Sequence, residues 1–238
     1  MLSEEQKKRY NRQILLENFG EKGQECLLAS KCLVVGLGGL GSVISLYLTA
    51  AGVGKIGLMD SDKVSLSNLH RQILYREKQS GKSKAEMACE NLKELNSDCE
   101  FEVFDCFLNE ENAEKIISEY DLVMDATDNF KARYLINDVC QRLRKPFVYC
   151  AISETSGQVA FFEPNNGKAN YRTLFPNEDE LKQKENSSKA VIGTLPSLAA
   201  TLATNEAIRF LVNGKSELED KLLCFDLTTL NFQIFDLE

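Results

Sequence analysis

A glycine-rich turn between a short apolar run and an apolar helix is the part of this sequence best suited to chemistry. The glycines of the turn are Gly36, Gly38, Gly39 and Gly41, and they follow the apolar run 32–35. Glycine lets the backbone turn sharply and approach a phosphate closely. The free N–H groups at the start of the next helix would then face the anion. The pattern predicts a nucleotide site with NAD as the default nucleotide, and the alternative is a tight packing turn between strand and helix.

An acidic residue stands at the end of the next predicted strand. The run 55–59 ends on Asp60, roughly 20 residues beyond the glycine turn, where dinucleotide-binding units place the acid that meets ribose hydroxyls. The spacing therefore predicts that Asp60 holds the sugar of a bound nucleotide.

Two polar side chains in the segment after this strand could reach the same phosphates. Asn68 and Arg71 lie beyond the carboxyl end of strand 55–59, the edge at which open α/β sheets bind ligands. An arginine can hold a phosphate through two nitrogens at once. The alternative is a loop that is held by hydrogen bonds of its own Ser and Asn side chains.

Lys84 and Asp128 stand at the beginning of two further predicted helices. A lysine at a helix start opposes the helix dipole, so we expect Lys84 to serve an anion, although Glu86 could pair with it instead. Asp128 follows the buried strand 122–125 and could bind Mg²⁺ through carboxylate oxygen. It could also cap the helix that begins near Asn129.

These residues need a scaffold in which strands and helices alternate. Helical and strand periodicities of the apolar residues identify its elements. The predicted strands are 32–35, 55–59, 100–104, 122–125, 147–151, 158–163, 222–226 and 232–236; the predicted helices lie within 3–29 (broken near Gly20 and Gly23), up to Ala51, and at 84–95, 109–120, 129–144 and 195–212. The alternation predicts an α/β fold: a Rossmann-like, mostly parallel sheet with helices on both faces. Only a short turn, 153–157, separates the fifth and sixth strands, so the C-terminal strands should be antiparallel.

The chain of 238 residues suits one domain, 1–238. We expect residues 1–29 to form an N-terminal helical arm. Residues 164–190 are polar and have no apolar periodicity, so we expect a mobile crossover loop there, because long loops in compact domains are commonly functional lids or disordered.

Composition narrows the functional classes. The chain has 28 basic and 36 acidic residues and a formal net charge of −8, which argues against a broad nucleic-acid footprint. No apolar run approaches the roughly 20 residues of a membrane span, and the charged N-terminus lacks a signal-peptide core, so we expect a cytoplasmic protein. Its eight cysteines form no CxxC pair, which favours buried, reduced thiols over a zinc site.

Taken together, the motifs resemble those of the ThiF/MoeB/HesA family, the bacterial relatives of ubiquitin-activating enzymes. The residues that carry the resemblance are Arg9–Ile14, Gly36–Gly41, Asp60–Asp62, Ser67–Gln72, Lys84 and Asp125–Asn129. The similarity covers essentially the whole chain and is strongest from Arg9 to Asn129. It replaces NAD by ATP as the expected nucleotide.

The resemblance implies a MgATP-dependent adenylyltransferase. Its substrate would be the C-terminal glycine carboxylate of a small ubiquitin-like sulfur-carrier protein that ends in Gly-Gly, and its products would be an acyl-adenylate and pyrophosphate. By position, the resemblance implies that the four glycines Gly36, Gly38, Gly39 and Gly41 face the phosphates and that Asp60 holds the ribose. It implies further that Asn68, Arg71 and Lys84 bind the triphosphate and that Asp128 binds Mg²⁺. The remaining residues of the nucleotide site would be Asp62, Ser67, Gln72 and Asn129. Arg12 would reach into the site of a neighbouring subunit, which implies a homodimer. From composition alone, the segment Arg9–Ile14 reads instead as a surface helix with solvated arginines.

Two departures from the family pattern matter. Many relatives hold zinc with two CxxC pairs, but the place of the first pair is occupied here by Asn170–Thr173, so we expect no zinc. Some relatives also carry a cysteine in the crossover loop, where this chain has Asn186–Lys189. We therefore expect adenylation without a covalent intermediate on a loop cysteine.

Other functions remain open at this stage. The same fold could act on another acceptor in peptide or tRNA modification, and the acidic charge balance weighs against tRNA. A non-catalytic scaffold subunit is favoured by the missing zinc and loop cysteines and disfavoured by the retention of Arg71, Lys84 and Asp128. An NAD-dependent dehydrogenase is the most distant alternative.

Overall fold

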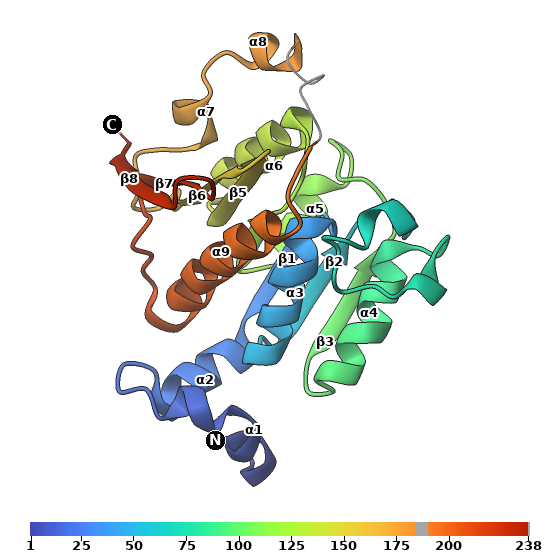
Figure 1. Ribbon diagram of the computed structural model, residues 1–238. Helices are drawn as coiled ribbons and strands as arrows, with labels where there is room; N and C mark the ends of the chain where they lie inside the picture. Colours follow the sequence, from blue (N-terminus) through green and yellow to red (C-terminus); the bar gives the residue numbers. More distant parts are fainter. Residues whose placement is uncertain (184–189, 238) are drawn as a thin grey trace.

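The computed structural model describes residues 1–183 and 190–237. Its described part contains an eight-stranded sheet in the order β3-β2-β1-β4-β5-β6-β7-β8 (Figure 1). The strands are β1 (Lys31–Val35), β2 (Lys55–Met59), β3 (Glu100–Phe104), β4 (Leu122–Asp125), β5 (Phe147–Ser153), β6 (Ser156–Phe162), β7 (Lys221–Asp226) and β8 (Asn231–Asp236). Strands β1 to β5 pair in parallel, and β6, β7 and β8 are added antiparallel. The predicted mixed sheet is therefore confirmed.

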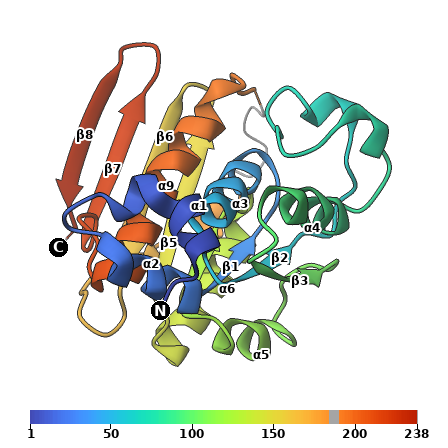
Figure 2. The ribbon, with the colours of Figure 1, turned by 90° about the horizontal axis from the view of Figure 1, so that it is seen from below.

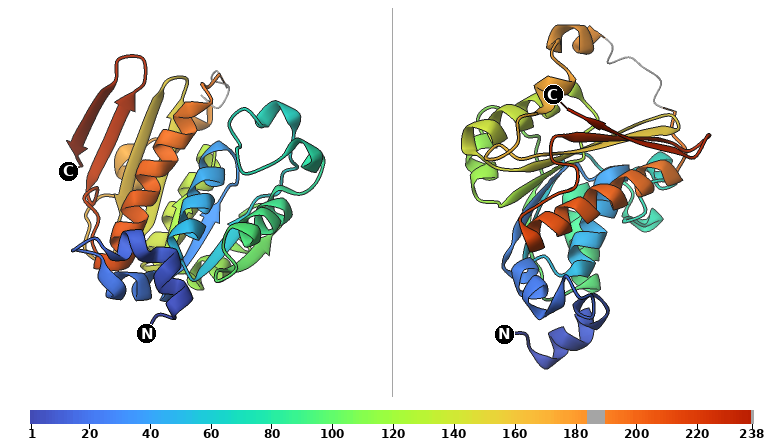
Figure 3. Two further views of the ribbon diagram at one scale, coloured as in Figure 1. Left: turned by 60° about the horizontal axis from the view of Figure 1, so that its bottom comes forward. Right: turned by 90° about the vertical axis from the view of Figure 1, so that its left-hand side faces the viewer.

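Helices cover both faces of the sheet. The helices are α1 (Glu4–Ile14), α2 (Gly20–Ala29), α3 (Gly39–Ala51), α4 (Lys84–Leu95), α5 (Ala113–Ser118), α6 (Phe130–Leu143), α7 (Tyr171–Leu174), α8 (Glu178–Gln183) and α9 (Thr194–Asn213), with short 3-10 turns at Leu66–Asn68 and Glu77–Gln79. Helices α3, α4 and α9 contribute to one apolar core, and α5 and α6 contribute to the other. The right-hand panel of Figure 3 shows α9 and α6 on opposite sides of the sheet.

Side-chain alternation along the central strand explains the two cores. Cys32 and Val34 of β1 belong to the core beneath α3 and α9, whereas Leu33 and Val35 belong to the core beneath α5 and α6. A parallel strand that is covered on both faces reads as a continuous apolar run. The run that precedes the glycine turn is therefore a buried central strand.

The N-terminal arm packs at the amino ends of the parallel strands. The backbone N–H of Gly54, just before β2, donates to Leu27 O of α2, and Gly23 of α2 lies against Val212 near the end of α9. Figure 1 shows α1 and α2 at the lower end of the molecule, and Figure 2 looks at the molecule from that end. The arm is thus at the end of the sheet opposite to the carboxyl ends of β1, β2 and β4.

Three predicted elements differ from the structure. The helix expected at 109–120 is the shorter α5, because the Asn109 side chain accepts the backbone N–H groups of Glu111 and Asn112 and forms a turn instead. The stretch 164–190 is not wholly irregular, since α7 and α8 lie within it. Gly23 does not break the arm: it lies inside α2, which begins at Gly20 with φ +62°.

Candidate functional site

A cleft of about 1600 Å³ opens at the carboxyl ends of the parallel strands. The ends of β1, β2 and β5 contribute to it, together with the loops that follow β1, β2 and β4. Eleven of the residues singled out from the sequence line it: Gly36, Gly38, Gly39, Asp60, Asp62, Asn68, Arg71, Gln72, Lys84, Asp128 and Asn129. The structure therefore brings together side chains that are distant in the sequence, at the edge where open α/β sheets place their ligands.

The four glycines of the turn have different tasks. Gly36 adopts φ +90°, and a Cβ there would lie 2.7 Å from Ala126 O. A Cβ at Gly41 would lie 1.8 Å from Gly36 O, and Gly41 does not line the cleft. A Cβ at Gly38 would meet only Gln72 Nε2, at 3.6 Å. Gly36 and Gly41 thus allow the turn to form, whereas Gly38 leaves the backbone open towards the cleft.

Asp60 is hydrogen-bonded to the glycine turn that follows the neighbouring strand β1. Its Oδ2 accepts the Leu37 N–H at 2.7 Å, and its Oδ1 accepts the Asp62 N–H at 2.8 Å. Burial raises the pKa of Asp60, and the Lys84 ammonium and the two backbone hydrogen bonds oppose the rise. Each carboxylate oxygen has a second lone pair, so Asp60 can brace the turn and still accept a sugar hydroxyl.

Lys84 is a buried cation at the base of the cleft. The residue is 3% exposed, and its Nζ lies 2.8 Å from Asp62 Oδ2 and 4.0 Å from Asp60 Oδ2. The anions that face Lys84 are therefore these two carboxylates, and the suggested pairing with Glu86 is wrong. The preceding residue, Ser83, caps α4, because its Oγ accepts the Glu86 N–H at 3.4 Å.

Arg71 is held by its neighbours on the opposite side of the glycine turn. Its Nη2 donates to Asn68 Oδ1 at 3.1 Å, and its Nη1 lies 2.8 Å from His70 Nε2. Arg71 also lies close to the turn itself, since a Cβ at Gly39 would be 3.5 Å from Arg71 Cγ. Asn68 thus orients the guanidinium, and both residues can contribute to an anion site.

Asp128 is an exposed acid that lines the cleft. The cap of α6 is not Asp128 but Asn129, whose Oδ1 accepts the Ala132 N–H at 2.9 Å. Asp128 makes no hydrogen bond or ion pair with any residue that the structure describes. Its carboxylate is therefore available to a ligand, and the capping alternative is excluded.

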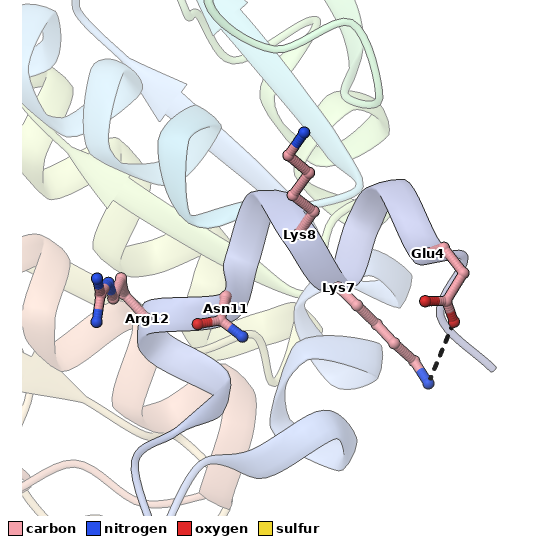
Figure 4. Close-up of a pocket in the computed structure, with 5 residues that line it drawn as sticks. All are labelled: Glu4, Lys7, Lys8, Asn11 and Arg12. Atoms are coloured by element: carbon pink, nitrogen blue, oxygen red, sulfur yellow. Dashed lines mark ion pairs between the residues drawn. The ribbon is translucent and has the colours of Figure 1, made fainter.

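Besides Gly41, two of the predicted residues do not line the cleft. Ser67 is exposed and its Oγ lies 3.0 Å from Ser65 Oγ, so it stabilises the loop rather than the site. Arg12 lies on α1, beside a shallow surface hollow that also includes Glu4, Lys7 and Asn11 (Figure 4). The side chain of Arg12 is exposed and has no partner among the described residues.

Several side chains of the motif around Arg12 bind the rest of the molecule, whereas Arg12 itself is exposed. Tyr10 is buried, and its hydroxyl accepts a hydrogen bond from Asn96 Nδ2 at 2.8 Å. The Gln13 amide donates to Ala51 O at 2.8 Å, and Arg9 donates to Leu95 O at 3.2 Å. These contacts fix the arm to the body of the molecule. Arg12 is consequently a free cation on a firmly attached helix.

The place where relatives carry the first CxxC pair is a helix cap here. Asn170 caps α7 by accepting the Arg172 N–H at 2.8 Å. Tyr171 is buried against Tyr134, Tyr149 and Phe175, and Arg172 forms a two-pronged ion pair with Asp138 at 2.8 and 2.7 Å. Within the described ranges no group of three or more His, Cys, Asp or Glu side chains could hold a metal ion. Residues 186–189, the place of the loop cysteine, lie outside the described residues.

Two residues that support or line the cleft were not predicted from the sequence. Tyr75 is buried and donates its hydroxyl to Leu37 O at 2.9 Å, which braces the glycine turn from a second side. Arg133 lines the cleft and is 9% exposed. One signal was present for it: Arg133 precedes Ile136 and Cys140 by three and seven residues, so it lies on the apolar face of a helix.

All eight cysteines fall within the described residues, and all are free. Five of them are buried, whereas Cys26 is exposed and Cys106 and Cys224 are intermediate. In the described ranges, no helix combines the length and apolar character that crossing a bilayer requires.

Fold and cleft define an α/β protein with a polar cleft at the carboxyl ends of its parallel strands, and the comparisons identify its family. The sequence profile of the ThiF family matches residues 10–238. The chain belongs to the ThiF family.

Relatives with curated names align over most of this chain. A probable molybdopterin-synthase adenylyltransferase of Porphyra purpurea is 41% identical over 95% of this chain and 60% of its own length. An adenylyltransferase and sulfurtransferase MOCS3 of Culex quinquefasciatus is 41% identical over 92% of this chain and 50% of its own length. A sulfur carrier protein adenylyltransferase of Thermus thermophilus is 40% identical over 97% of this chain and 87% of its own length. The chain thus spans about half to 60% of the first two relatives.

Solved structures share the architecture. E. coli MccB with MccA-N7isoASN superposes with a TM-score of 0.87 at 21% identity, over 97% of this chain and 72% of that one. PaaA superposes with a TM-score of 0.85 at 24% identity, over 99% of this chain and 75% of that one. At these identities the likeness establishes the fold alone.

Proposed function

We propose that this chain is a MgATP-dependent adenylyltransferase that activates the C-terminal glycine carboxylate of a small ubiquitin-like sulfur-carrier protein. The product is an acyl-adenylate, and pyrophosphate leaves. The names of the relatives at 40–41% identity support the activity and the kind of substrate. Residues 1–238 act as one adenylation domain in this proposal, and the eight free cysteines support a cytoplasmic location.

The observation that carries the proposal is the convergence of Arg71, Lys84 and Asp128 on the rim and base of one cleft around an open glycine turn. A triphosphate suits this arrangement because backbone N–H groups at a helix start attract anions. The open position at Gly38 allows a phosphate to approach the backbone. Asp60 is within the same cleft and can hold the ribose.

The chemistry needs no general base. A glycyl carboxylate is already ionised at neutral pH, so the barrier lies in bringing that anion to an α-phosphate that other negative charges surround. Arg71 and Lys84 offset this charge, and their positions beside the glycine turn align the phosphates for attack. Charge compensation by fixed cations is thus the main contribution of this chain.

Asp128 is the residue that would hold Mg²⁺. A single protein carboxylate is sufficient, because Mg²⁺ at nucleotide sites takes most of its other ligands from phosphate and water. The free carboxylate of Asp128 fits this donor set. Mg²⁺ bound there with the triphosphate supplies Lewis-acid neutralisation of phosphate charge.

Arg12 supports a homodimer in this proposal. It is exposed and unpaired within the described part of the chain, on an arm that Tyr10 and Gln13 anchor. The arm lies at the end of the sheet away from the cleft of its own chain. We therefore assign Arg12 to the cleft of a partner subunit.

The test is ATP–pyrophosphate exchange with a candidate carrier that ends in Gly-Gly. We expect Arg71→Ala and Asp128→Ala each to lower the exchange rate by at least about 100-fold, because each removes a charge that stabilises the reacting phosphates. Arg142→Ala is the matched control, since Arg142 is an exposed arginine of α6 that pairs with Glu114 at 3.7 Å. Near-normal exchange in Arg71→Ala or Asp128→Ala refutes the assigned role, and mass spectrometry of the acyl-AMP identifies the product directly.

A further inference from the structure

The turn that follows β4 presents Asp128 to the cleft, and buried charged side chains hold it from both sides. Asp125 is the last residue of β4; it and the turn residues Ala126 and Thr127 are buried, and the turn ends on the exposed Asp128. The backbone of Thr127 is its centre. Thr127 is hydrogen-bonded to two side chains: its N–H donates to Asp125 at the end of β4, and its carbonyl accepts from Arg133 of α6.

Asp125 holds the N–H side of Thr127. The Asp125 carboxylate is fully buried, and its Oδ1 accepts the Thr127 N–H at 3.1 Å and the Thr127 hydroxyl at 2.7 Å. Two donors from one residue on a single carboxylate oxygen fix both the backbone and the side chain of that residue. Hydrogen bonds to charged groups are also stronger than neutral ones.

Arg133 holds the carbonyl side of Thr127. Its Nη2 donates to Thr127 O at 2.9 Å, and its guanidinium lies 5.6 Å from the centre of the Phe130 ring and 5.5 Å from that of Tyr149. The two rings restrict where the guanidinium can go. Arg133 is therefore a fixed donor rather than a mobile surface cation.

The turn is also joined to the phosphate-binding backbone. The Ala126 N–H donates to Val35 O at 3.0 Å. A Cβ at Gly36 would lie 2.7 Å from Ala126 O and 3.3 Å from Thr127 N, so the two backbones are in direct contact. A shift of Thr127 would consequently move Asp128 relative to the glycine turn.

Asp128 itself has no partner that could hold it. Among the residues that the structure describes, none forms a hydrogen bond or an ion pair with its carboxylate. Its place is set by the backbone on either side: the clamped Thr127 before it and the capping residue Asn129 after it.

We propose that Asp125, Thr127 and Arg133 form a clamp whose task is to aim the Asp128 carboxylate at the metal of bound MgATP. These three are positioning residues in this proposal: Thr127 and Arg133 line the cleft, but their assigned task is to make the hydrogen bonds that fix the backbone before Asp128. The inference rests on the proposed function, because it requires that Asp128 meets Mg²⁺. It adds that the Thr127 hydroxyl, which donates to the buried Asp125 carboxylate, controls how much affinity the metal contributes.

The experiment measures the Kd of ATP by calorimetry in excess Mg²⁺ and in EDTA, and takes the ratio as the metal-dependent gain in affinity. We expect Thr127→Val to lower this gain about ten-fold, because it removes the hydroxyl that bonds a charged group, while the Kd in EDTA stays unchanged. Thr127→Ser keeps the hydroxyl and should keep the gain. Thr204→Val is the matched control: Thr204 is also buried, but its hydroxyl donates to Ala200 O inside α9.

A double-variant cycle separates positioning from general loosening. Asp128→Asn should abolish the metal-dependent gain, and adding Thr127→Val to it should change nothing further, because the clamp acts only through Asp128. A wild-type gain in Thr127→Val, an equal loss in Thr204→Val, or an additive loss in the double variant overturns the clamp. A wild-type gain in Asp128→Asn refutes the metal role itself, which is a failure of the proposed function and is recognisable as such.

Discussion

Asp60 carries a negative charge that its surroundings only partly compensate. The Lys84 ammonium lies 4.0 Å away and two backbone N–H groups bond the carboxylate, yet burial outweighs them and raises its pKa. The folded site therefore takes up a proton on acidification before an ordinary aspartate would. Protonation removes the charge that braces the Leu37 N–H and that accepts hydroxyl hydrogen bonds.

We expect the affinity for ATP to fall on acidification, at a higher pH than the titration of an ordinary aspartate. The sign follows from the raised pKa, since the site is competent only while Asp60 is ionised. The measurement is the Kd of ATP against pH in the wild type and in Asp60→Asn. The ratio of the two affinities cancels the titration of the phosphates themselves. A ratio that does not change with pH contradicts the role of the Asp60 charge.

Sequence reasoning at the residue scale succeeded where a residue type is chemically unusual at its place. Lys84 at a helix start and Asp60 at a strand end are such cases, and both line the cleft. Tyr75 and Arg133 were missed because their roles depend on a backbone carbonyl far away in the sequence or across a turn. Only the fold shows which carbonyl a buried donor will reach.

The glycine turn between β1 and α3 makes a prediction at the scale of an element. Gly41→Ala should prevent stable folding, because its Cβ would lie 1.8 Å from the Gly36 carbonyl oxygen, which is backbone and cannot move aside. Gly38→Ala should fold normally, since its Cβ meets only a flexible Gln72 amide at 3.6 Å. The variant should nevertheless bind ATP at least about ten-fold more weakly, because the added methyl group would lie where a phosphate approaches the backbone. Melting curves and ATP titrations of both variants check this contrast. Equal stability of the two variants contradicts it.

Elements with continuous apolar runs or clear helical spacing were predicted closely. Strands β2, β3 and β4 have the predicted bounds, and α9 extends the prediction by one residue at each end. The failures are α5, α7 and α8, which are short. Helices of this length take most of their stability from tertiary contacts; for α7 these are the Tyr171 ring in its aromatic cluster and the Arg172–Asp138 ion pair.

At the scale of the whole molecule, the arm and the cleft lie at opposite ends of the sheet. If Arg12 completes the cleft of a partner, two different defects can compensate. We expect a mixture of Arg12→Ala and Arg71→Ala chains to recover about a quarter of the wild-type activity, because roughly half the dimers would be mixed and each would hold one complete site. The measurement is pyrophosphate exchange after the two inactive proteins are mixed and allowed to exchange subunits.

A mixture of Arg71→Ala and Asp128→Ala serves as the control. Both side chains line the cleft of their own chain, so a mixed dimer of these two still has two defective sites and should stay inactive. Light scattering reports whether dimers are present. Recovery in the control, or none in the Arg12 mixture despite dimers, removes the assignment of Arg12 to a partner.

The burial of Lys84 between two carboxylates sets an entry condition for ligands. Its ammonium is already paired with the Asp62 carboxylate at 2.8 Å before anything binds, and the Lys84 side chain is 4% exposed although that of Asp62 is 63% exposed. An uncharged nucleoside offers nothing that would draw the lysine away, whereas a polyphosphate brings several negative charges and can take over as its partner. The pairing of Lys84 with Asp62 therefore favours ligands that carry several negative charges over uncharged ligands of similar shape.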